Sequence, residues 1–477
     1  MTDIPKVNTQ PQRALALDAL RGIAILMMVF ASAIPFGVLP SWMYHAQEPP
    51  PLHIANPNLP GITWVDLVFP FFLFAMGAAI PLSLSRKFKQ GVKSLKIYQS
   101  VIGRGLLLAG FAIYFCQINP YSLSTAQDWR SWAIAVLGFA FVFPILARLP
   151  ESWSKSAKYS LKAIGWIGAV SLMAIVRFPD GTGFSLYKSD IIILVLSNVA
   201  VFGSIIWIIS RDNWLLRLGF LGFLLAIRLS AHTTGWAHTL WNISPVPWLF
   251  QFKFLTYLFI IIPGTIAGDL ILNWMNSANT QSENVSNWSK IRLSSIAAVA
   301  FFIVIEVVAG MKLRLVLPAF ILSLALCSII WRLTQKPGNA SEKFLSSIFK
   351  WGTYWLILGF LFDSFEGGIK KDPSTMSYYF VTSGLAILVL ITFTIIIDIF
   401  GKKKYFGLLI RSGQNPMVAY GGLNNIVIPV LALTKLNLVL QYLTPTPWLG
   451  VLGGAFITYL VALAATFATK KKIFLRT

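Results

Sequence analysis

Residues 61–84 read GITWVDLVFPFFLFAMGAAIPLSL, and this stretch decides the fold class. It is an apolar run with one charged side chain, Asp66, close to its start. About 20 apolar residues in helical form span the hydrocarbon core of a bilayer, so the run predicts a transmembrane helix. A carboxylate there is costly unless it has a partner, which makes Asp66 a candidate functional residue. The alternative is that Asp66 only caps the helix together with Thr63.

Similar apolar runs recur along the whole chain of 477 residues, which is 56% hydrophobic and 12% charged. Soluble domains carry roughly 25% charged residues, so the composition predicts an all-α, polytopic membrane helix bundle. We expect about 12–14 transmembrane helices, because the short connections within residues 190–231 and 293–331 leave the number open. They would form one domain over residues 15–477, after a cytoplasmic tail over residues 1–14.

The formal net charge of +22 has an explanation within the membrane topology. Most Lys and Arg residues fall in alternate loops, which the positive-inside rule assigns to the cytoplasm together with both termini. The positive charge is therefore explained by the position of these loops beside a lipid bilayer. We expect no nucleic-acid partner. The basic segments cover residues 86–96, 148–162, 402–411 and 470–472.

All four histidines fall in loops of the opposite, outer face. His45 and His53 precede the helix of Asp66, and His232 and His238 lie in a later loop. An imidazole titrates near physiological pH, so a histidine beside Asp66 would suit proton transfer or acyl transfer at the membrane surface. The six-residue spacing of the later pair does not fit a metal site on a helix, and we expect no metal.

Three other polar segments interrupt the apolar pattern. Residues 17–22, LDALRG, begin the first predicted helix, with Asp18 and Arg21 one turn apart. Lys371 and Thr375 lie in an outer loop where basic residues are scarce, and Asn415 begins a later helix. Each segment also has a structural explanation. Asp18 and Arg21 could cap the first helix, the Lys371 loop could simply be solvated, and the Asn415 amide could join two helices. The functional alternative is strongest for Arg21, because a guanidinium suits a phosphate group.

Two parts of the chain carry motifs of a known membrane enzyme family. The first joins LDALRG, a histidine loop and G-x-T-x-x-D-L-x-F-P at residues 61–70. The second joins K-x-x-x-T-x-S at residues 371–377, T-x-G at residues 382–384, and Gly413, Asn415 and Tyr420. Over roughly residues 13–90 and 365–425 the chain thus resembles the heparan-α-glucosaminide N-acetyltransferase family and its bacterial relatives.

One position departs from the family. The family has an asparagine eleven residues after the arginine of the first motif, where this chain has Ser32. The more distant acyltransferase-3 family has a histidine there, so Ser32 speaks against that family. A weaker hydrogen-bonding group then fills one polar role of the site.

The resemblance implies a catalytic histidine in the first outer loop. The Tyr-His-Ala context favours His45, whereas the distance to the motif at residues 61–66 favours His53. Asp66 would fix the tautomer of that imidazole, as the carboxylate of a catalytic triad does. The expected activity is transfer of an acetyl group from cytosolic acetyl-CoA to an amino sugar or related glycan across the cytoplasmic (inner) membrane of a bacterium.

Acetyl-CoA, the expected co-substrate, would enter from the cytoplasmic side and have its phosphates held by basic side chains. The acceptor would bind at the outer face, and helices near residues 19–38, 63–84, 379–400 and 414–434 would share one cavity. N- versus O-acetylation stays open, as does the oligomeric state, for which a homodimer is one candidate. The expected CoA site comprises Asp18, Arg21, Arg86, Lys87, Arg104 and Asn415, and the acceptor site comprises Trp42, Trp64, Lys371 and Thr375.

Two other functions fit the same sequence features. A transporter or flippase for a sugar or a lipid-linked sugar would also use aromatic outer loops and buried charges, but it would need no acyl donor. A non-catalytic membrane scaffold is the third possibility. The absence of nucleotide-binding loops and nucleophile elbows from the sequence argues against ATP hydrolysis and serine hydrolase chemistry.

Overall fold

The structure is a computed structural model, and it describes residues 14–147, 153–231, 233–277 and 287–475. Within these residues, twelve helical segments are long and apolar enough to cross a membrane, which confirms the predicted all-α membrane fold. They are α1 (Leu15–Ala33), α2 (Trp64–Lys89), α3 (Ser94–Gln117), α5 (Trp129–Leu146), α7 (Ile191–Ser210), η2 (Phe252–Tyr257) with α10 (Leu258–Ser277), α11 (Lys290–Lys312), α12 (Val316–Leu333), α13 (Ala340–Phe362), α14 (Met376–Phe393) with η3 (Thr394–Ile399), α16 (Pro416–Gly422) with η4 (Leu423–Val427) and α17 (Ile428–Leu433), and α19 (Pro447–Lys470).

Two further long helices, α6 (Lys155–Ile175) and α8 (Trp214–Ser230), are not among these twelve. The predicted number of 12–14 transmembrane helices corresponds to the twelve segments without and with these two helices. Shorter helices include α4 (Pro120–Leu123), α9 (Trp236–Trp241), α15 (Gly407–Gln414) and α18 (Leu436–Leu443). In α9, His238 Nδ1 lies 2.7 Å from the Ala231 carbonyl oxygen, whereas His232 lies outside the described residues. The predicted tail also lies outside them except for Ala14.

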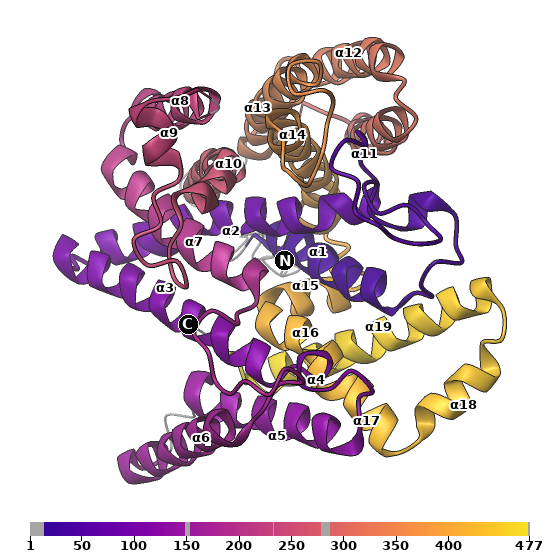
Figure 1. Cartoon of the computed structure of the whole chain (residues 1–477). Coiled ribbons are helices and arrows are strands. Elements are labelled where there is room, and N and C mark those ends of the chain that lie inside the picture. The colour runs from indigo at the N-terminus through magenta and orange to yellow at the C-terminus, as the bar shows by residue number, and fades with distance from the viewer. Residues whose placement is uncertain (1–13, 148–152, 232, 278–286, 476–477) are drawn as a thin grey trace, which may run out of the picture.

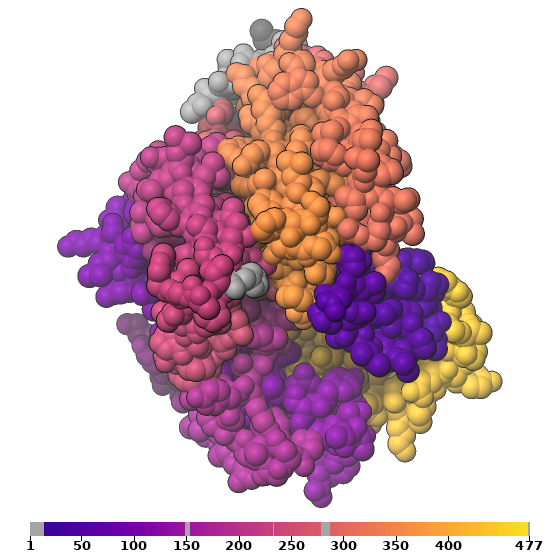
Figure 2. Space-filling view, turned by 45° about the horizontal axis from the view of Figure 1, so that its top comes forward, coloured from indigo at the N-terminus to yellow at the C-terminus, as the bar shows by residue number. Residues whose placement is uncertain are grey.

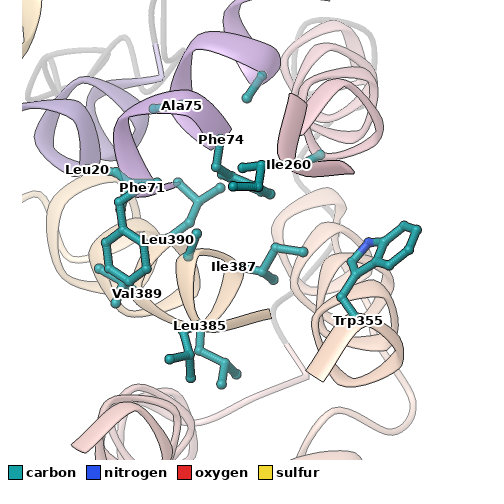
Figure 3. Close-up of a cluster of buried hydrophobic side chains, with 14 of the residues drawn as sticks. Leu20, Phe71, Phe74, Ala75, Ile260, Trp355, Leu385, Ile387, Val389 and Leu390 are labelled. Carbon is teal, nitrogen blue, oxygen red and sulfur yellow. The ribbon is translucent and has the colours of Figure 1, made fainter. Parts of the chain in front are cut away.

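Two groups of helices lie on either side of α1 and α2 (Figure 1). One apolar core joins α1 and α2 to α10–α14, and another joins α3, α5, α16, α17 and α19. Every residue of α14 is buried, as expected for a helix that is apolar on all sides. Figure 3 shows Ile387 of α14 between Trp355 on one side and Leu20 and Phe71, from α1 and α2, on another.

Glycines allow α1 and α2 to approach their neighbours closely. A Cβ atom on Gly22 of α1 would overlap the carbonyl oxygen of Leu409 in α15, and a Cβ on Gly264 of α10 would overlap that of Phe74 in α2. Small residues at membrane helix contacts permit this backbone approach, which strengthens van der Waals packing. The two helices that carry Arg21 and Asp66 are therefore held against α15 and α10.

Both described ends of the chain lie on one face, which we call the terminal face. Leu475 N–H donates to the Asn415 side chain (3.3 Å), and the adjacent Gln414 donates to Asp18 near the start of α1 (3.2 Å). The opposite face, which we call the loop face, carries residues 34–63 and 363–375. Gly61 N–H in the first segment donates to the carbonyl of Ile369 in the second (2.7 Å), and Figure 2 shows the corresponding indigo and orange parts at one surface.

Candidate active site

The loop before α2 places the His45 imidazole against the Asp66 carboxylate. His45 Nδ1 lies 2.7 Å from Asp66 Oδ1, and the backbone N–H groups of Thr63 and Ala46 donate to Oδ2 at 2.9 and 3.1 Å. The Asp66 side chain is only 1% exposed. The carboxylate therefore caps α2 and orients an imidazole at the same time, so the two roles considered for Asp66 do not exclude each other.

Lys371 approaches the same imidazole from the loop between α13 and α14. Its Nζ lies 3.1 Å from His45 Nδ1 and 3.2 Å from Nε2. Gln47 fixes the position of this lysine, because its Oε1 accepts from the backbone N–H groups of Lys371 (3.1 Å) and Asp372 (3.0 Å). Burial lowers the pKa of Lys371, and the charge of Asp66 opposes that shift. Residues more than 300 positions apart thus form one cluster.

Ion pairs hold the loop that carries Lys371. Arg314 donates to both carboxylate oxygens of Asp363, at 3.1 and 2.7 Å. Arg228 pairs with Glu366 (2.9 Å). Thr375, a predicted acceptor-binding residue, caps α14 and accepts from the Lys370 N–H (3.0 Å), so it shapes this loop from a buried position.

His53 is turned away from Asp66. Its ring stacks on Phe36, with 4.1 Å between ring centroids, and meets Tyr44 edge-on at 4.4 Å. Its Nε2 atom is buried and has no hydrogen-bond partner within the described residues. Of the two histidines considered from the sequence, the structure brings His45 to the carboxylate.

His45 lines a cavity of about 230 Å³, which we call the His45 cavity. Ser32 lines it from α1, and the Ser32 hydroxyl donates to the Met28 carbonyl (3.1 Å). Asp190, which caps α7, lines it too and accepts a hydrogen bond from the Tyr420 hydroxyl (2.7 Å). Sequence analysis missed Asp190, although a carboxylate directly before an apolar run is the same signal that drew attention to Asp66.

A second cavity, of about 410 Å³, contains Arg21 and Arg104 and is called here the arginine cavity. The Arg21 guanidinium also donates to the carbonyls of Gly413 (3.1 Å) and Ala75 (3.3 Å), and it lies 3.6 Å from Asp18. The arginine cavity and the His45 cavity adjoin, because four residues line both of them: Met28, Phe69, Ile192 and Tyr420.

The other predicted CoA-binding residues lie outside the lining of the arginine cavity. Arg86 is exposed near the end of α2, and Lys87 donates to Ser100 (2.7 Å). Asn415 is buried and uses its amide to hold the C-terminal segment, donating to the Ile473 carbonyl (2.7 Å). The structure thus brings Arg21 and Arg104 together in one cavity, and assigns Asn415 a packing contact.

Trp42 and Trp64 line a different cavity from the one that His45 lines. Both line an apolar groove of about 740 Å³ that Lys312 and residues of α1, α2 and α11 complete. Neither tryptophan lines the His45 cavity. The two tryptophans expected from the sequence to bind the acceptor are therefore not part of the lining of the His45 cavity. Within the described residues there is no group of three His, Cys, Asp or Glu side chains that could hold a metal ion.

Comparison with known proteins confirms the resemblance. The chain is 24% identical over 203 residues to human heparan-alpha-glucosaminide N-acetyltransferase, a match that covers 37% of this chain and 28% of that protein. The mouse protein of the same name is 26% identical over 188 residues, which cover 35% of this chain and 26% of the relative. The chain therefore spans little more than a quarter of the length of these curated relatives.

A family model matches residues 13–271, which include Arg21, His45, Asp66, Arg104 and Asp190. The matched region covers more than half of the chain. The match stops before Lys371 and Tyr420, which complete the cluster and the cavity in space. By this match the chain belongs to the family described as "Domain of unknown function (DUF5009)".

Proposed function

We propose that this protein is a membrane acyltransferase that moves an acetyl group from cytosolic acetyl-CoA to an amino sugar or related glycan on the far side of a bacterial inner membrane. The observation that carries the proposal is the His45–Asp66–Lys371 cluster in a cavity that adjoins the arginine cavity. The N-acetyltransferase relatives support the reaction class.

The terminal face would be the cytoplasmic one. The basic segments at residues 402–411 and 470–472 adjoin α15 and the end of α19 on this face, which fits the positive-inside rule. Arg21 and Arg104 would bind phosphate groups of CoA through charge-assisted hydrogen bonds. The acetylated pantetheine arm would then pass Phe69 and Tyr420, which line both cavities, and reach His45.

The cluster has the groups that acyl transfer needs. The Asp66 carboxylate would accept from Nδ1–H of His45, so the basic lone pair of the neutral imidazole would lie on Nε2, which Lys371 Nζ approaches to 3.2 Å. The Lys371 ammonium would stabilise the negative charge that develops on the thioester oxygen. In the reaction a bond forms between the acceptor and the carbonyl carbon, the carbon–sulfur bond breaks, and the acceptor proton passes through His45 to the CoA sulfur.

Transport of a sugar is the second candidate, and the two adjoining cavities favour it. A transporter would need no acyl donor, so the donor requirement separates the two functions. We would incubate the purified protein in lipid nanodiscs with acetyl-CoA and glucosamine, and measure CoA thiol release and acetylated product. Transfer that requires both substrates, together with thermal stabilisation by CoA, would support the acyltransferase. If neither acetyl transfer nor stabilisation by CoA is observed, that result counts against the acyltransferase.

A further inference from the structure

Asp190 is a carboxylate that lines the His45 cavity together with the reactive histidine. Within the described residues, three side chains of acidic or basic residues line this cavity: His45, Lys371 and Asp190. Asp66 is buried behind His45 and has its own partners. Among the described residues, Asp190 therefore supplies the one carboxylate in the lining of the cavity that also contains His45 and Lys371 of the proposed acyl-transfer cluster.

Three elements hold the Asp190 side chain and backbone in place. Its Oδ1 accepts from Ile193 N–H (3.1 Å), its Oδ2 accepts from the Tyr420 hydroxyl (2.7 Å), and its backbone N–H donates to the Ala112 carbonyl (3.0 Å). A carboxylate has about four lone-pair positions, so these contacts leave capacity for another donor. Burial raises the pKa of Asp190, which makes its carboxylate a better proton acceptor.

The other charged groups near Asp190 do not neutralise it. Lys188, on the preceding loop, is paired with Asp180 (2.7 Å). Among the described residues, Tyr420 on α16 and Cys116 near the end of α3 also interact with Asp190, and both are uncharged when protonated. His45 and Lys371 line the same cavity.

We propose that Asp190, held by Tyr420, is a further catalytic residue that binds the ammonium group of an amine acceptor and removes its first proton. This inference rests on the acyl-transfer function proposed above. It divides the work between two carboxylates, because Asp66 orients the imidazole and Asp190 prepares the acceptor.

N-acetylation requires that a protonated amine first loses a proton, and Asp190 would accept it. An amine arrives mainly as R–NH3⁺ at neutral pH and cannot attack while its lone pair carries a proton. Asp190 takes that proton, the free amine forms a bond to the thioester carbonyl carbon, and the second proton passes to His45. The carbon–sulfur bond then breaks, His45 protonates the CoA sulfur, and Asp190 releases its proton to the outer solution.

The test compares Asp190→Asn with Asp128→Asn in the full-length protein in nanodiscs. Asparagine is also a good N-cap residue, so the first variant loses the charge and keeps the cap. Asp128 caps α5 in the same way (2.9 Å to Ser131 N–H) and does not line the cavity, which makes it the matched control. We would measure KM and kcat for glucosamine, and thermal stabilisation by glucosamine and by N-acetylglucosamine, which lacks the ammonium group.

We expect Asp190→Asn to raise the KM for glucosamine about tenfold or more, since a hydrogen bond to a charged group is lost. It should abolish stabilisation by glucosamine, and its defect should shrink at alkaline pH, where more of the amine is already neutral. Asp128→Asn should match the wild type in all three measurements. Tyr420→Phe should give a smaller change of the same kind, and it serves as the second test if Asp190→Asn does not fold.

The assignment would be overturned if Asp190→Asn had a KM for glucosamine within twofold of the wild-type value and the same pH dependence as the wild type. Failure of the proposed function gives a different result, because the wild type would then acetylate no amine at all. In that case stabilisation by glucosamine, compared between the wild type and Asp190→Asn, still decides whether this carboxylate binds an ammonium group.

Discussion

The His45 cavity and the arginine cavity adjoin but are built from different parts of the fold. The acidic and basic groups at the His45 cavity come from loops and helix starts, where backbone N–H groups and side chains such as Gln47 fix them. The arginine cavity takes its charges from within helices, Arg21 in α1 and Arg104 in α3. The groups of the His45 cavity are thus held in fixed orientations, whereas the arginine cavity contributes positive charge. Substitutions in the first should change the rate, and substitutions in the second should change CoA affinity.

The largest effect is expected at His45. His45→Ala removes the proposed base, so kcat for acetyl transfer should fall about 10²–10⁴-fold. His53→Ala is the matched control in the same loop, because that ring packs on Phe36 and Tyr44 away from Asp66, and it should keep a near-normal rate. Initial rates of CoA release measure both variants. If both variants lost the same activity, or if neither lost any, His45 would not be distinguished from His53 as the catalytic histidine.

Asp66→Asn should come next, with kcat reduced by about 10²-fold or more, because an amide no longer favours the required tautomer of His45. The same change should weaken the hydrogen bonds from the Thr63 and Ala46 N–H groups by about 1 kcal/mol in total, because a neutral amide oxygen is a weaker acceptor than a carboxylate. Transfer rates and thermal unfolding of the same sample separate these effects. A variant that loses activity only in proportion to its unfolded fraction would mean that Asp66 is structural.

Lys371→Met should lower kcat about tenfold or more, because a charge at the developing oxyanion is lost. Burial lowers the pKa of Lys371, so this lysine loses its proton at a lower pH than an ordinary lysine does. The wild-type rate should therefore decline on the alkaline side as this charge is lost, and the variant should lack that decline. Lys370→Met is the control, since Lys370 does not line the cavity. Identical pH–rate profiles for wild type and Lys371→Met would contradict this role.

The smallest effect is expected in the arginine cavity. Arg104→Ala should weaken CoA binding by about three- to tenfold and leave kcat at saturating acetyl-CoA almost unchanged, because exposed charge contacts contribute little individually. Binding should also weaken with added salt, which screens such contacts. Isothermal titration with CoA at two ionic strengths measures this, with exposed Arg86→Ala as control. If Arg104→Ala changed kcat more than affinity, the division of work between the cavities would be wrong.

The sequence by itself determined the membrane fold and drew attention to the residues that begin the site. Apolar length and the distribution of basic loops are local properties, so they predict helices and their alternation without any knowledge of packing. Asp66 was visible for the same reason, because a carboxylate in an apolar run needs no distant residue to be noticed. The family resemblance then directed attention to a histidine in the loop before it.

Tertiary structure decided which side chains meet. His45 and His53 share one loop, and only the path of that loop turns one ring toward Asp66 and the other toward Phe36. Lys371 reaches His45 because α14 packs against α2, although the two residues are far apart in sequence. Rotation of the helices likewise sends Trp64 to the apolar groove and brings Asp190 to the cavity. These outcomes depend on helix rotation and loop path, which arise from packing over the whole chain and which no local pattern encodes.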